Sequence, residues 1–85
     1  MSDHPTDFQG SVTEAIEAAV RAAIPGCEVS AVGGGGHYEI TVIAEQFAGQ
    51  RTLAKHRLVL GAIKHLMAGD MAPVHAVDRI VAKVP

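Results

Sequence analysis

A chain of 85 residues is long enough for one small domain but too short to enclose a large catalytic cleft, so its length favours a binding or adaptor module over an enzyme. A hydrophobic content of 48% with 19% charged residues is typical of a folded globular protein, and no apolar run approaches the roughly 20 residues of a membrane span. The formal net charge of -2 disfavours strong binding to nucleic acid. A single cysteine and a polar amino terminus fit a reducing compartment, so we expect a cytoplasmic protein.

The chain begins with ten residues that show no apolar periodicity, and we expect residues 1–10 to form a flexible tail and residues 11–85 a single domain. Ser11 and Glu14 have the spacing of a helix capping box, in which the serine hydroxyl accepts from the backbone N–H of residue 14 and the Glu14 side chain reaches back to the backbone of Ser11. A first helix is predicted from there to Pro25, because apolar residues recur at helical spacing: Val12, Ile16, Ala19, Val20, Ala23 and Ile24.

Two strands are predicted on either side of four consecutive glycines. Residues 27–32 alternate between apolar and other side chains, as do residues 38–44, which is the pattern of strands buried on one face. The simplest pairing is an antiparallel hairpin in which the glycines at 33–36 form a mobile loop.

A longer helix is predicted over residues 52–68, followed by a third strand over residues 74–82. The buried side of this helix is expected to carry a stripe of residues spaced by three and four positions: Leu53, His56, Leu60, Ile63 and Met67. The order helix-strand-strand-helix-strand predicts an α+β fold, with helices packed on one face of a small three-stranded sheet.

The second half of the chain carries a segment without acidic residues, from position 46 to 69. It contains Arg51, Lys55, Arg57 and Lys64, which either form a solvated helix face or a docking surface for an acidic partner.

Three histidines stand at positions where imidazole chemistry is of interest, because imidazole binds borderline metals and titrates near neutrality. His37 opens the second predicted strand and His75 starts the third, and each is either an exposed residue at a strand end or a metal ligand. His56 lies on the predicted helix stripe, so we expect a structural role in which its ring bonds a backbone carbonyl. No set of residues has the composition of a nucleophilic triad, and we expect no catalytic residue.

The ordered set of motifs in this chain resembles the BolA family. It comprises His37-Tyr38 entering an alternating strand, Phe47-Ala48-Gly49, Lys55-His56-Arg57 and Val74-His75-Ala76-Val77. The resemblance implies an α+β fold related to type II KH domains, with a helix-turn-helix-like segment and with Phe47 and Gly49 as structural residues.

The resemblance also implies a function. BolA-like proteins are adaptors that bind a monothiol glutaredoxin and share a bridging [2Fe-2S] cluster in iron–sulfur trafficking or iron regulation. A glutaredoxin cysteine and glutathione hold one side, and the histidine at the position of His75 ligates the other. The isolated protein is then expected to carry no cofactor. The alternative is a DNA-binding regulator that uses the helix-turn-helix-like segment and its basic residues.

Two departures from the family pattern bear on the site. The second ligand of the family usually comes from a Cys or His between the first two strands, but the loop 33–36 contains only glycine, which leaves His37 as the nearest candidate. The last strand reads Val77-Asp78-Arg79-Ile80, which shifts the usual apolar spacing.

Overall fold

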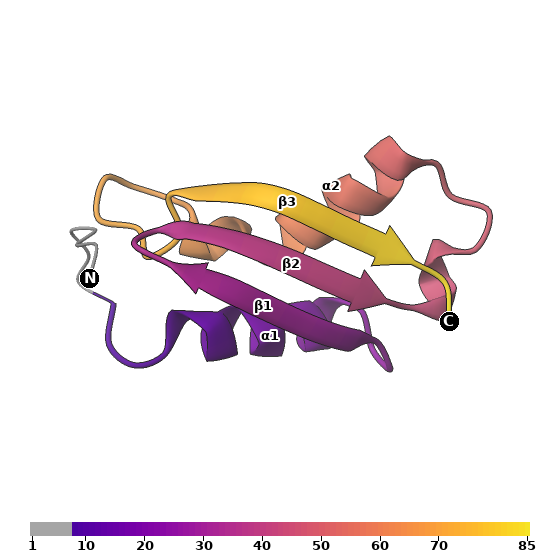
Figure 1. Cartoon of the computed structure of the whole chain (residues 1–85), viewed down its shortest axis with the longest axis horizontal. Helices are drawn as coiled ribbons and strands as arrows, with labels where there is room; N and C mark the ends of the chain where they lie inside the picture. The colour runs from indigo at the N-terminus through magenta and orange to yellow at the C-terminus, as the bar shows by residue number, and fades with distance from the viewer. Residues whose placement is uncertain (1–7) are drawn as a thin grey trace.

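Three strands form one sheet, and two α-helices cover one of its faces (Figure 1). The computed structural model describes residues 8–85. Its elements confirm the predicted α+β order: α1 (Val12–Ala23), β1 (Glu28–Gly34), β2 (His37–Ile43), the 3-10 helix η1 (Glu45–Phe47), α2 (Thr52–Ala62), the 3-10 helix η2 (Lys64–Leu66) and β3 (Ala76–Lys83). Within the described residues, no helix has the length and hydrophobicity needed to cross a membrane.

The predicted tail falls partly outside this description, because nothing is described for residues 1–7. Phe8 is half-buried and packs against the hydrophobic core. The contacts of the domain therefore begin before the helix cap at Ser11.

The sheet has the order β1-β2-β3, with β1 and β2 antiparallel, as predicted, and β2 and β3 parallel. Gly34 pairs with His37, so only Gly35 and Gly36 connect the first two strands. Both have positive φ, +62° and +87°, which is the conformation of a tight two-residue turn and is accessible to glycine without strain. The expected four-glycine mobile loop is wrong: the other two glycines belong to β1.

The core lies between the sheet and the two helices. Alternate residues of β2 point into it, and Tyr38, Ile40 and Val42 are all buried, as the strand pattern predicts. Helix α1 contributes Ile16 and Val20, both fully buried. The buried side chains among residues 8–85 are all apolar, so burial of apolar surface stabilises this face of the sheet.

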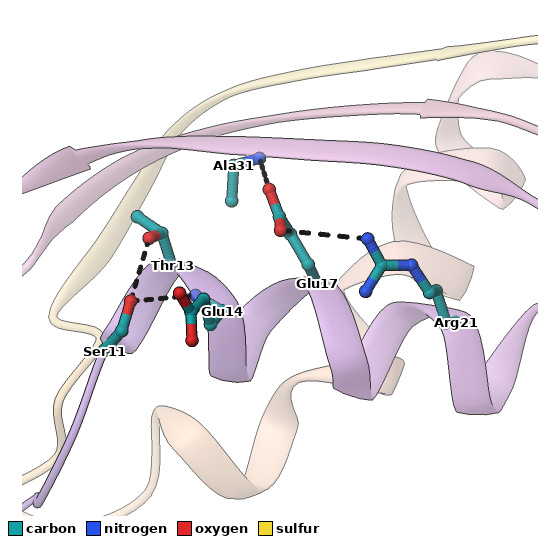
Figure 2. Close-up of polar contacts among 6 residues, drawn as sticks. All are labelled: Ser11, Thr13, Glu14, Glu17, Arg21 and Ala31. Carbon is teal, nitrogen blue, oxygen red and sulfur yellow. Dashed lines mark hydrogen bonds and ion pairs between the residues drawn. The ribbon is translucent and has the colours of Figure 1, made fainter.

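Polar contacts fix the first helix at its start and against the edge of the sheet (Figure 2). The Ser11 hydroxyl accepts from the backbone N–H of Glu14 at 3.2 Å, which is one half of the predicted capping box. The reciprocal bond to the Glu14 side chain is not found among residues 8–85. The carboxylate of Glu17 accepts from the backbone N–H of Ala31 on β1 at 3.0 Å and lies 3.8 Å from the guanidinium of Arg21. Glu17 thus binds a backbone donor of an edge strand, which would otherwise need water.

The predicted stripe of the second helix is wrong at two positions. Leu53 and Leu60 are 61% and 37% exposed, whereas Val59 and Ile63 are fully buried. Apolar residues occur on several sides of this helix, so the spacing alone does not select one face, and packing against α1 and the sheet selects that of Val59. The α-helix also ends at Ala62 and not near residue 68, and η2 continues the chain in a tighter form.

Candidate metal centre

The β1–β2 turn and the segment entering β3 meet at one end of the sheet (Figure 1). The carbonyl oxygen of Gly36 accepts from the backbone N–H groups of His75 and Ala76, at 2.8 and 2.9 Å. His37 is the first residue of β2 and His75 directly precedes β3. These hydrogen bonds hold the two histidine backbones side by side, although 38 positions separate them in the chain.

The two imidazole rings lie close enough to share a ligand. Their centroids are 5.6 Å apart with an interplanar angle of 42°, and both side chains are exposed to solvent. Two imidazoles on one tetrahedral metal, at metal–nitrogen distances of about 2.1 Å, place their ring centroids about 5 Å apart. The observed centroid separation is close to that value.

One carboxylate also lies at this site. The Asp78 Oδ1 is 3.2 Å from His37 Nδ1, and both side chains are about half exposed, at 53% and 54%. Gly36, His37, His75 and Asp78 together are called the histidine end of the sheet below.

The two imidazoles fit one iron of an iron–sulfur cluster better than a single metal ion held by several side chains of this chain. In the described part of the chain, no group of three or more His, Cys, Asp or Glu is arranged to hold a metal ion. His37 and His75 would suffice to hold one iron of a [2Fe-2S] cluster, as histidine pairs do in Rieske centres. The histidine end therefore fits a cluster whose second iron is held by other ligands.

The single cysteine is not part of this site. Cys27 precedes β1 at the opposite end, where Glu28 pairs with Ile43, so the length of β2 separates it from His37 by about 20 Å at roughly 3.3 Å per residue. Burial raises the pKa of the Cys27 thiol, although the nearby Arg21 opposes this shift. A raised pKa disfavours the thiolate, which is the metal-binding form.

The residues predicted to be structural lie away from the histidine rings. Phe47 is 2% exposed in the core, and Gly49 follows it with a φ of +76°, in the left-handed region that favours glycine. His56 is half-buried on α2, one helical turn from the buried Val59. None of the side-chain hydrogen bonds among residues 8–85 involves the His56 ring, so the expected bond to a backbone carbonyl is not found there.

The four basic residues are distributed along α2 and its two ends. Arg51, Arg57 and Lys64 are exposed, whereas Lys55 is half-buried on the side of His56. The exposed face also carries Leu53. Exposed cations and an exposed apolar side chain therefore occur together on this segment.

A family model described as "BolA-like protein" matches residues 8–84, which is nearly the whole chain. The chain belongs to the BolA family. This agrees with the order of motifs in the sequence and with the observed fold.

Solved structures of BolA proteins resemble this family member closely. A BolA protein homologue from Coxiella burnetii is 31% identical, with a TM-score of 0.74 over 89% of this chain and 94% of its own. BolA1 from Mus musculus is 32% identical, with a TM-score of 0.65 over 100% of this chain and 74% of its own. The BolA domain of SufE1 from Arabidopsis thaliana, at 21% identity and a TM-score of 0.74 over 92% of this chain and 96% of its own, shares the fold. A search of curated protein sequences returned no match.

The sequence interpretation of this BolA-family chain missed one residue of the histidine end. Asp78 was noted only as part of a shifted apolar spacing. The signal that could have revealed it is the three-residue step from Val77 to Ile80, which breaks the two-residue alternation of a strand and predicts a bulge with extra exposed residues.

Proposed function

We propose that this protein is a BolA-like adaptor that binds a monothiol glutaredoxin and shares a bridging [2Fe-2S] cluster with it, in iron–sulfur trafficking or in iron and redox regulation. The observation that carries the proposal is the pair of exposed imidazoles, 5.6 Å apart, at the end of the sheet in a chain of this family. His75 is proposed as the first ligand and His37 as the second.

The proposed division of ligands follows from the donors on each side. This chain would supply two ring nitrogens to one iron, and the glutaredoxin cysteine and a glutathione thiol would supply sulfur to the other. Ligands presented across an interface must be accessible and held by a rigid backbone. His37 and His75 are exposed, and the Gly36 carbonyl fixes the backbone beside both of them. Histidine ligation raises the potential of such clusters relative to thiolate ligation.

We propose no catalytic activity for the protein itself. The single half-buried cysteine fits a reducing compartment, and the cytoplasm is the proposed location.

The proposal is tested by co-expression with a monothiol glutaredoxin, purification of the complex and measurement of its visible absorption. The parent complex is expected to be coloured, and His75→Ala to lose most of the cluster absorption. His65→Ala is a matched control, because His65 is also exposed but lies on η2, outside the histidine end. A colourless parent complex, or an unchanged spectrum in His75→Ala, contradicts the proposal.

The second candidate is a DNA-binding regulator. The observation in its favour is the acid-free segment with exposed Arg51, Arg57 and Lys64. Non-specific binding through these cations would weaken steeply with salt. Because Arg57→Gln removes about one phosphate contact, it would reduce the slope of the logarithm of the binding constant against the logarithm of the salt concentration by about 1. Mobility shifts on duplex DNA at two salt concentrations separate this candidate from the adaptor, which predicts no shift at physiological salt.

A further inference from the structure

Strand β3 contains one residue more than the part of β2 that it pairs with. Tyr38 pairs with Val77 and Glu39 pairs with Arg79, so Asp78 has no partner across the ladder. Such a bulge bends the strand and turns a side chain in a new direction, and bulges are frequent beside functional sites.

The bulge explains how two residues three positions apart in β3 can both face the core. Val77 and Ile80 both pack against the core although they are three positions apart, and the two residues between them are exposed. In a regular strand, residues three apart face opposite sides of the sheet. The bulge therefore keeps both apolar residues on the covered face and leaves Asp78 free to point toward the start of β2.

The contact that results has a defined chemical consequence. A neutral imidazole carries its proton on one ring nitrogen and a lone pair on the other, and an ionised carboxylate only accepts hydrogen bonds. In the 3.2 Å contact, Asp78 Oδ1 therefore accepts from a proton on His37 Nδ1. The lone pair is then on Nε2, which is the atom left available to a metal.

We propose that Asp78 is a positioning residue: it holds the His37 ring in the Nδ1–H tautomer and directs Nε2 toward the cluster iron beside His75. This inference rests on the proposed function, in which His37 is the second ligand. Carboxylates that bond the far nitrogen of a ligating histidine fix its orientation and increase its basicity, and their loss typically costs 10–100-fold in metal affinity. Because Asp78 is half exposed, we expect an effect of about tenfold, at the lower end of this range.

The tautomer is measured on the isolated protein, without any cluster, from the ¹⁵N chemical shifts of the His37 ring, recorded as the pH is raised until these shifts no longer change. The parent is expected to show mainly the Nδ1–H form. Asp78→Ala should shift the ring toward the Nε2–H form that free histidine prefers, and Asp78→Asn should restore part of the parent signal because its amide oxygen still accepts. Glu39→Ala is the matched control, since it removes an exposed carboxylate from the same strand as His37. An unchanged tautomer in Asp78→Ala, or an equal shift in Glu39→Ala, overturns the inference.

The second arm is the lifetime of the cluster in the glutaredoxin complex, followed by the decay of visible absorption in the presence of a chelator. His37→Ala and Asp78→Ala are each expected to shorten it about tenfold, and Glu39→Ala to leave it unchanged. If His37→Ala shortens the lifetime and Asp78→Ala does not, the inference is wrong while the proposed function stands. If His37→Ala has the lifetime of the parent, His37 is not a ligand, and the inference falls with that part of the proposed function.

Discussion

The helix-covered face of the sheet and the histidine end include neighbouring residues of β2, but the two regions differ in burial and in the interactions that hold them. Tyr38 is 5% exposed and belongs to an apolar core, whereas the side chain of His37, one residue earlier, is 54% exposed. The covered face holds its residues by burial of apolar surface, and the histidine end holds its backbone by hydrogen bonds to Gly36. From this comparison we expect that substitutions can change stability and the proposed metal ligation separately.

The largest expected effect comes from the core. Phe47→Ala should lower the free energy of unfolding by about 3–5 kcal/mol, because it removes a buried aromatic side chain and leaves a cavity. Urea denaturation of the isolated protein measures this loss. His75→Ala is the counterpart at the histidine end and should change stability by less than about 0.5 kcal/mol, since its side chain is exposed. Similar losses in the two variants would contradict the separation of the two regions.

A smaller effect is expected where the two regions touch. A Cβ on Gly33 would overlap the carbonyl oxygen of His37 and lie 2.9 Å from the Cα of Tyr38, and the φ of +137° at Gly33 disfavours other residues. Gly33→Ala should therefore cost about 1–3 kcal/mol and also shift the backbone at His37.

Gly34→Ala is the control for that substitution, because a Cβ on Gly34 meets no atom within 4 Å. The two variants are compared by urea denaturation and by the amide chemical shifts of residues 36–38. Equal stabilities would show that the close approach at Gly33 can relax without cost.

The edge contact of β1 is expected to contribute less. Glu17→Ala removes the acceptor of the Ala31 backbone N–H and should cost about 1.5 kcal/mol. Arg21→Ala removes only the 3.8 Å ion pair, which is largely exposed, and should cost less than about 0.5 kcal/mol. Thermal or urea unfolding measures the stability loss in each variant. A larger loss in Arg21→Ala than in Glu17→Ala would contradict the greater contribution expected from the hydrogen bond to Ala31.

A smaller effect than that of Glu17→Ala is expected at His56. Its ring is half-buried and bonds no described residue through a side-chain hydrogen bond, so His56→Ala should cost only about 1 kcal/mol, from lost packing near Val59. The absorption of the glutaredoxin complex should not change. If His56→Ala were as stable as the parent but lost the cluster absorption, His56 would act at the proposed metal centre and not in packing.

The sequence by itself determined the parts of the fold that depend on neighbours along the chain. The serine cap of α1, the alternation of β2 and the order of the five main elements were predicted correctly, because caps and periodicities are local signals. The positions of His37 and His75 at predicted strand starts already made them candidate ligands. The family resemblance added the cluster that they are proposed to bind.

Tertiary structure decided the features that depend on residues far apart in sequence. Several faces of α2 are apolar, so only packing against α1 and the sheet could choose Val59 over Leu53 and Leu60. The parallel pairing of β3 with β2 brings His75 to His37, and the bulge at Asp78 then places a carboxylate 3.2 Å from the His37 ring. The physical reason is that register is set by which side chains must be buried on both strands at once. The step from Val77 to Ile80 can signal a bulge, but the sequence of one strand does not say which residue of the partner strand the bulged carboxylate will face.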